Sequence, residues 1–171
     1  RDHEHLAHCR GYRRMSAIFQ HGEGNLLDAR TDALVNAVNT VGVSGKGIAL
    51  AFKKAYPWAF EDYRRAALAG RVVPGEMYVQ AIRGDRPPLW LINFPTKRHW
   101  RDQSVLGDID DGLVDLAKFV YRRNVRSIAI PALGCGNGGL SWGIVRTLIR
   151  AALGPVGNLT VILYPPPGEA I

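Results

Sequence analysis

Residues 35–47 read Val-Asn-Ala-Val-Asn-Thr-Val-Gly-Val-Ser-Gly-Lys-Gly, an apolar run that includes two asparagines and passes into a glycine-rich turn. The apolar run predicts a buried strand at 33–38. The glycines predict a tight turn, because glycine adopts positive φ without steric cost. A helix is expected at 47–55, and its free backbone N–H groups would face whatever the turn surrounds. Such a unit is typical of α/β proteins that bind anions.

Short apolar runs and amphipathic segments alternate along the rest of the chain. Further strands are expected at 17–21, 76–82, 89–94, 127–133 and 159–164, and further helices at 58–68, 104–123 and 141–153. Continuous apolar strands such as 128–130 need cover on both faces. The sequence therefore predicts an α/β fold, a three-layer α/β/α sandwich around a mixed, mostly parallel sheet of about six strands.

Helical periodicity predicts which side chains enter the core. Ser104 is expected to cap the third helix. The inward face of that helix is expected to carry Ile109, Leu113, Leu116 and Val120. The inward face of the last helix is expected to carry Ile144, Leu148 and Ala152.

The chain has 22 basic and 15 acidic residues, a formal net charge of +7. Residues 1–14 hold four of the basic and two of the acidic residues and lack hydrophobic periodicity. We expect them to be a disordered leader ahead of a single domain at 15–171. The alternative for the leader is a metal site made by His3, His5, His8 and Cys9. A basic body suits a polyanionic partner, although many soluble domains carry as much charge without one.

The hydropathy and the cysteine content of the chain indicate where in the cell it is expected. No apolar stretch approaches the roughly 18 residues that span a bilayer, so no membrane association is expected. The two cysteines are Cys9, in the expected leader, and Cys135, in a glycine-rich segment. A disulfide framework is therefore not expected, and the chain is expected to be cytoplasmic.

A second glycine-rich segment, Gly-Cys-Gly-Asn-Gly-Gly at 134–139, follows an expected strand and precedes an expected helix. Its spacing fits G-x-G-x-x-G, but a dinucleotide-binding fold requires an acidic residue at the end of the next strand, where Tyr164 stands. No nicotinamide or other cofactor is expected, whereas backbone N–H groups can cradle a phosphate here. Cys135 is either a nucleophile without an evident base or a small residue in a tight turn.

The first turn is not a P-loop, although Gly45-Lys46-Gly47 suggests one. That motif requires glycine where Thr40 stands and serine or threonine where Gly47 stands. The paired asparagines favour a binding role instead, because Asn39 can both donate to and accept from a sugar hydroxyl.

A third segment, Thr-Lys-Arg-His-Trp-Arg at 96–101, follows another expected strand. Lys97 then stands at the carboxyl end of a strand, where α/β proteins build their sites. Basic residues around one tryptophan suit phosphate contacts and base stacking. The alternative is a solvated run of charge.

Together these segments resemble a macrodomain, the α/β/α fold that binds ADP-ribose. Residues 24–27, 34–39, 42–48 and 134–139 match its ligand-contacting segments in order, and the resemblance covers about residues 16–164. Residues 39–49, 93–100 (Asn-Phe-Pro-Thr-Lys-Arg-His-Trp) and 134–142 more specifically resemble the DarG family. DarG proteins are antitoxins that remove from DNA the ADP-ribose that a DarT toxin has attached.

The resemblance implies a hydrolase that removes ADP-ribose from single-stranded DNA, with thymidine as the modified base. It implies that Lys97 and Asn39 are catalytic and that Asn39 holds the distal ribose. The ADP-ribose contacts it implies are Asn25, Leu26, Asn39, Gly45, Lys46, Gly47, Ile48, Thr96, Gly134, Cys135, Gly136, Asn137, Gly138 and Gly139. The expected DNA contacts are Arg98, His99, Trp100 and Arg101, and no metal is expected.

The sequence leaves alternatives open. The Lys97 amine either attacks the opened ribose to form a Schiff base or acts as a cation beside the leaving base. Many macrodomains carry aspartate where Asn25 stands, so adenine recognition through a carboxylate is left open. A related glycohydrolase pairs its lysine with an aspartate in the glycine loop, and 134–142 contain none, so the accessory acid or base is unassigned. A non-catalytic ADP-ribose reader, or a nucleic-acid module using 97–101 alone, remains possible. A DarT-type partner is expected of a longer protein, because DarG proteins carry a further carboxy-terminal domain.

Overall fold

A six-stranded sheet forms the centre of the computed structural model, which describes residues 16–171. Its strands are β1 (Ile18–His21), β2 (Ala33–Asn39), β3 (Tyr78–Ala81), β4 (Trp90–Lys97), β5 (Ser127–Pro131) and β6 (Thr160–Tyr164). They lie in the order β1-β6-β5-β2-β4-β3, and all neighbours are parallel except β3, which runs antiparallel to β4. The expected mixed, mostly parallel sheet is confirmed. The expectations for residues 1–14 lie outside the described residues.

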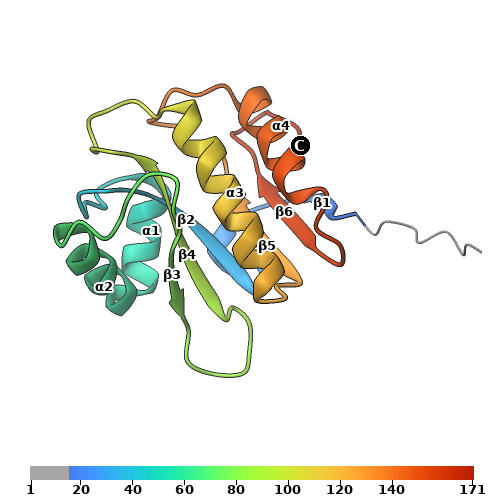
Figure 1. Cartoon of the computed structure of the whole chain (residues 1–171), viewed down its shortest axis with the longest axis horizontal. Helices are drawn as coiled ribbons and strands as arrows, with labels where there is room; N and C mark the ends of the chain where they lie inside the picture. Colours follow the sequence, from blue (N-terminus) through green and yellow to red (C-terminus); the bar gives the residue numbers. More distant parts are fainter. Residues whose placement is uncertain (1–15) are drawn as a thin grey trace, which may run out of the picture.

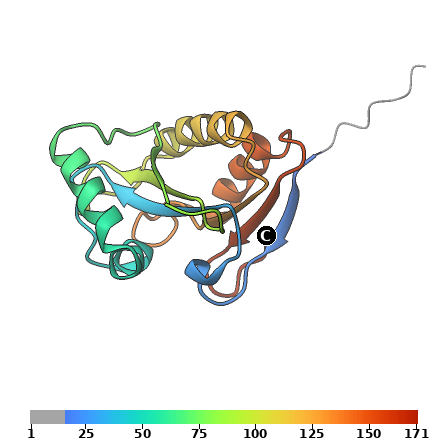
Figure 2. The ribbon, with the colours of Figure 1, turned by 90° about the horizontal axis from the view of Figure 1, so that it is seen from below.

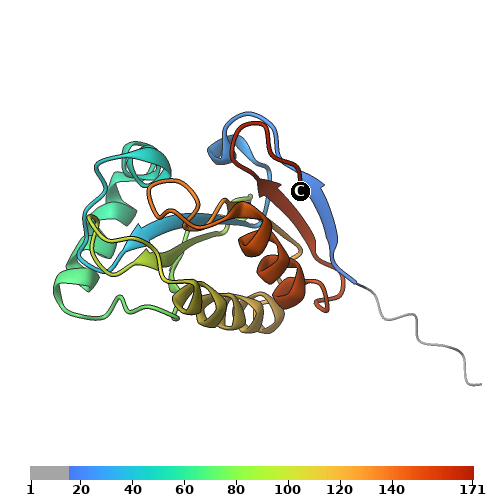
Figure 3. The same ribbon diagram turned by 90° about the horizontal axis from the view of Figure 1, so that it is seen from above.

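Helices cover both faces of the sheet. They are α1 (Gly47–Ala55), α2 (Pro57–Leu68), α3 (Leu106–Arg122) and α4 (Trp142–Leu153), with a short 3-10 helix, η1 (Leu26–Asp28), that the sequence analysis did not predict. In the edge views, α3 and α4 lie on one face of the sheet and α1 and α2 on the other (Figures 2 and 3). The three-layer prediction is therefore confirmed.

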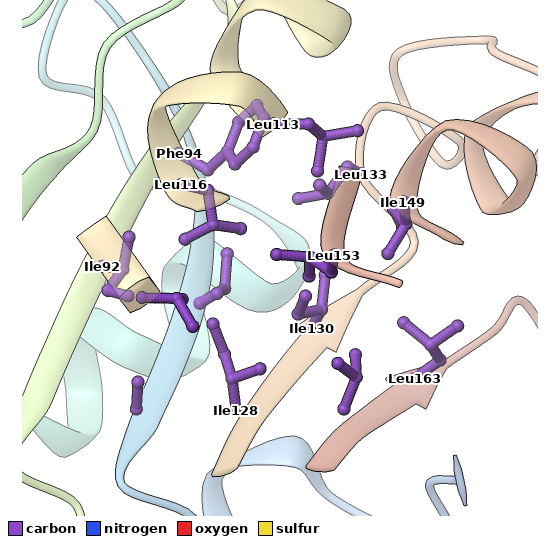
Figure 4. Packing of buried hydrophobic residues seen from close by; sticks show 14 of the residues in the cluster. Ile92, Phe94, Leu113, Leu116, Ile128, Ile130, Leu133, Ile149, Leu153 and Leu163 are labelled. Carbon is purple, nitrogen blue, oxygen red and sulfur yellow. The ribbon is translucent and has the colours of Figure 1, made fainter. Parts of the chain in front are cut away.

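The larger core lies between the sheet and helices α3 and α4 (Figure 4). Its fully buried side chains include Ile92, Phe94, Leu113, Leu116, Ile128, Ile130, Ile149, Leu153 and Leu163. Each contributes roughly 1.5–3 kcal/mol by leaving water. Gly112 lets α3 approach β4 closely, since a β-carbon there would lie 2.5 Å from the Phe94 ring. Smaller clusters under α1 and α2 cover the opposite face.

The inward face of α3 is as predicted, but two other helix predictions are wrong. Helix α3 starts at Leu106, and the residue at its cap position, Val105, makes no side-chain cap. Ser104 lies one residue before the cap position, and its side-chain oxygen has no hydrogen-bond partner among the described residues, so it does not cap the helix; its backbone N–H donates to the Gly138 carbonyl. Helix α4 is rotated somewhat from the expected face: its buried residues are Trp142, Val145, Ile149 and Leu153, whereas Leu148 and Ala152 are only partly buried against the core and Ile144 is exposed.

Strand β4 extends three residues further than expected, and its end is irregular. Val38 pairs with Pro95 and Asn39 with Lys97, so Thr96 is an extra residue on β4. This bulge brings Asn39 and Lys97 into register at the carboxyl ends of two adjacent parallel strands. Within residues 16–171, no helix combines the length and the apolar character needed to cross a membrane.

Candidate functional site

Three loops meet at the carboxyl edge of the central strands β5, β2 and β4, the upper edge of the sheet in Figure 1. Residues 40–46 follow β2, residues 98–105 follow β4, and residues 132–141 follow β5. Ligands of open α/β sheets bind at this edge. The structure therefore brings together the three segments that the sequence analysis singled out.

Asn39 ends β2 and organises the turn that follows it. Its side-chain oxygen accepts hydrogen bonds from the backbone N–H groups of Val41 and Val43, both at 3.2 Å. Its Nδ2 donates to the Val43 carbonyl at 2.7 Å. The side chain is 7% exposed, and only the second N–H of its amide is left for a ligand.

The orientation of Asn39 is held from below by Tyr63 of α2. The Tyr63 hydroxyl donates to the Asn39 carbonyl at 2.6 Å and lies 3.3 Å from Oδ1. Burial raises the pKa of Tyr63 to about 12, so the hydroxyl keeps its proton at neutral pH. The sequence analysis missed Tyr63, because its place on the buried face of an amphipathic helix signals only the core.

Lys97 ends β4 and reaches across the edge to the second glycine loop. Its Nζ donates to the Asn137 carbonyl at 2.6 Å. Two N–H bonds of the ammonium are then free for a ligand or for water. The Lys97 carbonyl accepts from the Thr40 backbone N–H at 3.1 Å, so the ends of β2 and β4 are also tied together.

The glycine loop at 134–139 has two kinds of glycine. Gly134 has φ +71°, and a β-carbon at Gly138 would lie 2.2 Å from the Ser104 hydroxyl oxygen and 2.4 Å from the Gly134 carbonyl. Gly134 needs glycine for its positive φ, and Gly138 needs glycine because a side chain would overlap its neighbours. At Gly136, by contrast, a β-carbon would meet no protein atom within 4 Å. Gly136 is exposed, so an open space borders this part of the loop.

Cys135 lies in the same loop but is poorly suited to act as a nucleophile. Burial, and secondarily the negative charge of Glu169, raise the pKa of its thiol to about 11. The thiol is therefore protonated at neutral pH, and the attacking species, the thiolate, is scarce. The structure favours the reading of Cys135 as a small residue in a tight turn.

The first glycine turn leads directly into α1. Gly47 has φ +57° and begins the helix, and Lys46 precedes it without making a side-chain cap. Gly45, Lys46 and Gly47 are exposed and Ile48 is half-buried. The first N–H groups of α1 therefore have no side-chain acceptor at the cap and point to the edge where an anion would be stabilised.

Two predicted contacts are used inside the protein. Leu26 is 3% exposed and packs in the core under α1, and the Thr96 hydroxyl donates to the Val38 carbonyl at 3.3 Å. Asn25 is exposed, but its side-chain oxygen caps η1 by accepting from Leu27 N–H at 3.1 Å. Of the implied ADP-ribose contacts, these three are the least free to bind.

The basic segment divides into an ion pair and a stacked group. Arg98 makes two hydrogen bonds with the Asp108 carboxylate, at 3.0 and 3.1 Å, and is committed to the start of α3. The ring of His99 lies 5.4 Å from that of Trp100, and the Arg101 guanidinium lies 4.5 Å from the centre of the Trp100 ring. Trp100 is 46% exposed. A stacked, exposed tryptophan beside a cation can take a nucleobase.

The fold and this edge define a class of protein. The chain belongs to the macrodomain family, since the Macro domain model matches residues 35–149. Within that family it is similar to the macrodomain of Mycobacterium tuberculosis DarG, a solved structure with 45% sequence identity and a TM-score of 0.85 that covers 88% of this chain and 99% of that one.

Two further relatives extend the comparison. The DNA ADP-ribosyl glycohydrolase of M. tuberculosis is 47% identical over 151 residues, which make up 88% of this chain and 43% of that protein. The structure of Thermosipho africanus DarTG in complex with ADP-ribose has 30% identity and a TM-score of 0.82, covering 91% of this chain and 44% of that one. The chain thus spans less than half the length of the curated relative.

Proposed function

We propose that this macrodomain binds ADP-ribose at the carboxyl edge of β5, β2 and β4 and hydrolyses the bond that joins ADP-ribose to a DNA base. The diphosphate would lie between the start of α1 and the open side of the loop at Gly136, where backbone N–H groups, open space and the exposed Lys46 side chain are offered. The distal ribose would lie between Asn39 and Lys97, whose strands are in register.

One observation carries the catalytic part of the proposal: the Lys97 Nζ lies at the meeting point of β4 and the glycine loop, 2.6 Å from the Asn137 carbonyl. An amine held there can attack C1″ of the ring-opened ribose and release the base, and water then hydrolyses the resulting Schiff base. Alternatively the ammonium stabilises charge on the leaving base while water attacks C1″. Both routes end in ADP-ribose and an unmodified base.

The choice of DNA as substrate has two supports. One is the name of the curated relatives, DNA ADP-ribosyl glycohydrolase. The other is the group of half-buried His99 and exposed Trp100 and Arg101 next to Lys97, which suits a single-stranded nucleic acid. We propose thymidine as the modified base.

A relative from T. africanus joins a transferase and a glycohydrolase in one fusion protein, which supports a DarT-type toxin as partner of the longer protein. A DNA substrate and the free Cys135 thiol favour a cytoplasmic location.

The test is incubation of the purified protein with a single-stranded oligonucleotide that carries ADP-ribose on thymidine, followed by separation of the products. We expect free ADP-ribose and the unmodified oligonucleotide. If the protein binds ADP-ribose in calorimetry but releases none from the oligonucleotide, the hydrolase is wrong and the chain is an ADP-ribose reader. If it does not bind ADP-ribose, both assignments are wrong.

A further inference from the structure

A chain of hydrogen-bonded amide side chains runs across strands β2, β4 and β3 beneath α2, and none of the roles above uses it. Asn36 Nδ2 donates to Asn93 Oδ1 at 3.1 Å, and Asn93 Nδ2 donates to Gln80 Oε1 at 2.8 Å. Each of the three side chains is no more than 6% exposed. Such bonds hold buried amides in one arrangement, because a buried N–H that loses its acceptor costs free energy.

Gln80 joins this chain to α2. Its Nε2 donates to the Ala59 carbonyl at 2.8 Å and to the Asp62 carboxylate at 2.9 Å. The Tyr78 hydroxyl donates to the same carboxylate oxygen at 2.8 Å. The hydrogen bond from Gln80 is the main cause that lowers the pKa of the Asp62 carboxyl from its usual value. Asp62 is therefore an anion at neutral pH, and its two hydrogen bonds are of the stronger, charge-assisted kind.

Both contacts of Gln80 on α2 lie in the helical turn that carries Tyr63. Ala59 is four residues before Tyr63 and Asp62 is one residue before it, so all three belong to one turn. The other buried residues of this helix are alanines, which bury little apolar surface. Helix α2 therefore has few large side chains that fix its position on the sheet, and the bonds from Gln80 supply part of that fixation.

We propose that Gln80 is a positioning residue for Asn39 and acts through Tyr63. The Tyr63 hydroxyl donates to the Asn39 carbonyl at 2.6 Å, a bond that depends on where α2 lies on the sheet. Gln80 itself is remote from the site: it pairs with Leu91, six positions before Lys97 on β4, which is roughly 20 Å along the strand. This role rests on the proposed function, in which Asn39 holds the distal ribose.

A double-mutant cycle on ADP-ribose affinity tests this route. We expect Gln80→Met and Tyr63→Phe each to weaken binding roughly fivefold, the effect of one lost hydrogen bond. If Gln80 acts through Tyr63, the double variant should also be weakened roughly fivefold, because the bond is already lost in Tyr63→Phe. A combined loss of roughly 25-fold, the product of two independent effects, would overturn the proposed role. Wild-type affinity in Gln80→Met would overturn it as well.

A second set of variants tests the same route if Gln80→Met does not fold. Asp62 is partly exposed, so Asp62→Ala should fold, and we expect it to weaken ADP-ribose binding roughly threefold. Asp62→Asn should keep the wild-type affinity, because its amide oxygen can still accept from Gln80 and Tyr78. Glu61→Ala, at the neighbouring exposed carboxylate of α2, is the matched control and should bind like the wild type. Equal losses in the two Asp62 variants, or a loss in Glu61→Ala, would contradict positioning by these hydrogen bonds.

Amide signals of the ligand-free protein separate this role from the proposed function. The backbone N–H groups of Val41 and Val43 donate to Asn39 Oδ1, so their NMR signals report the orientation of that side chain. We expect both signals to move in Gln80→Met but not in Val120→Ala, which destabilises the core near the end of α3. Unmoved signals in folded Gln80→Met would overturn the positioning role. Absence of ADP-ribose binding in the wild-type protein would instead contradict the proposed function, whatever the signals show.

Discussion

At the scale of single residues, Lys97 offers the sharpest separation of mechanisms. We expect Lys97→Ala to bind ADP-ribose but to lose most of its release from DNA. Lys97→Arg should fail similarly if the amine attacks carbon, because a guanidinium keeps the charge and cannot be deprotonated. Rates of ADP-ribose release and calorimetric affinities check this, with Lys118→Ala, an exposed lysine on α3, as the control.

The arginine variant decides between the two routes. Recovery of activity in Lys97→Arg would make the lysine an electrostatic stabiliser. Borohydride added during turnover gives an independent reading, since it would reduce a Schiff base to a stable adduct at Lys97, detectable by mass. Full activity in both variants would contradict any role for the lysine and would leave hydrolysis to a positioned water.

Asn39 both shapes the turn after β2 and is proposed to bind the distal ribose, and replacing it with alanine removes both roles. In Asn39→Ala the N–H groups of Val41 and Val43 lose their acceptor, and the Tyr63 hydroxyl loses one of two. We expect ADP-ribose binding and protein stability each to fall by ~1–3 kcal/mol. Calorimetry and thermal unfolding measure the two losses separately. Wild-type binding in a folded variant would confine Asn39 to shaping the turn.

At the scale of elements, the glycine loop allows a matched pair of substitutions. Gly136→Leu should fold normally, because a β-carbon there meets nothing, but its side chain would fill the space proposed for the diphosphate and abolish ADP-ribose binding. Gly138→Ala should instead destabilise the protein, because its β-carbon would overlap Ser104 and the Gly134 carbonyl. Thermal unfolding with calorimetry distinguishes them. Undiminished affinity in folded Gly136→Leu would contradict the site.

The segment after β4 offers a second pair, because Arg98 and Arg101 have different surroundings. Arg98→Ala would leave the Asp108 carboxylate, whose side chain is 11% exposed, without its partner and should lower stability modestly, because the Arg98 side chain is largely exposed and solvent screens the pair. Arg101→Ala should leave stability unchanged and raise KM for an ADP-ribosylated oligonucleotide. Denaturant unfolding and initial rates test both. If Arg98→Ala changes only KM, the ion pair with Asp108 does not contribute to stability and Arg98 contacts the DNA.

The buried face of a helix could be predicted where its apolar residues form one narrow stripe. It could not be predicted where contacts with distant residues determine how the helix is rotated. Helix α3 has a single apolar stripe, so its inward face follows from periodicity. Helix α4 also has one polar face, with Arg146, Thr147 and Arg150, but its apolar face is wide, so spacing alone does not show that Ile144 lies at its exposed edge. The bond from Trp142 Nε1 to the Ala170 carbonyl, across 28 residues, accompanies the observed rotation.

The same limit applies within the site. Asparagine, lysine and glycine at strand ends point to a binding edge, and the structure brings these segments together. Ser104 is an example of a contact that the sequence does not predict, because its backbone N–H donates to the Gly138 carbonyl, 34 positions away. The Tyr63 contact to Asn39 crosses 24 positions and leaves no local pattern. Hydrogen-bond partners that are brought together by packing therefore cannot be predicted from the sequence, whereas the residue types at strand ends can be read from it directly.

At the scale of the whole molecule, the distribution of charge differs between the site proposed for ADP-ribose and the surface proposed for the DNA strand. The chain carries a net charge of +7, but its basic residues are spread over the surface of several helices. The diphosphate loops offer backbone N–H groups and one exposed side-chain cation, Lys46. Beside Lys97, Arg98 is paired with Asp108, which leaves Arg101 as the exposed arginine of the stacked group.

Salt should therefore affect binding of DNA and of ADP-ribose differently. A single-stranded nucleic acid releases about 0.7 counterion for each phosphate that a cation neutralises. With one or two such contacts, log kcat/KM for an ADP-ribosylated oligonucleotide should fall against log salt with a slope of about −1, and Arg101→Ala should flatten it by about 0.7. The ADP-ribose affinity should change little over the same range. A slope several times steeper would mean that the DNA strand follows a longer basic surface than the segment after β4 provides.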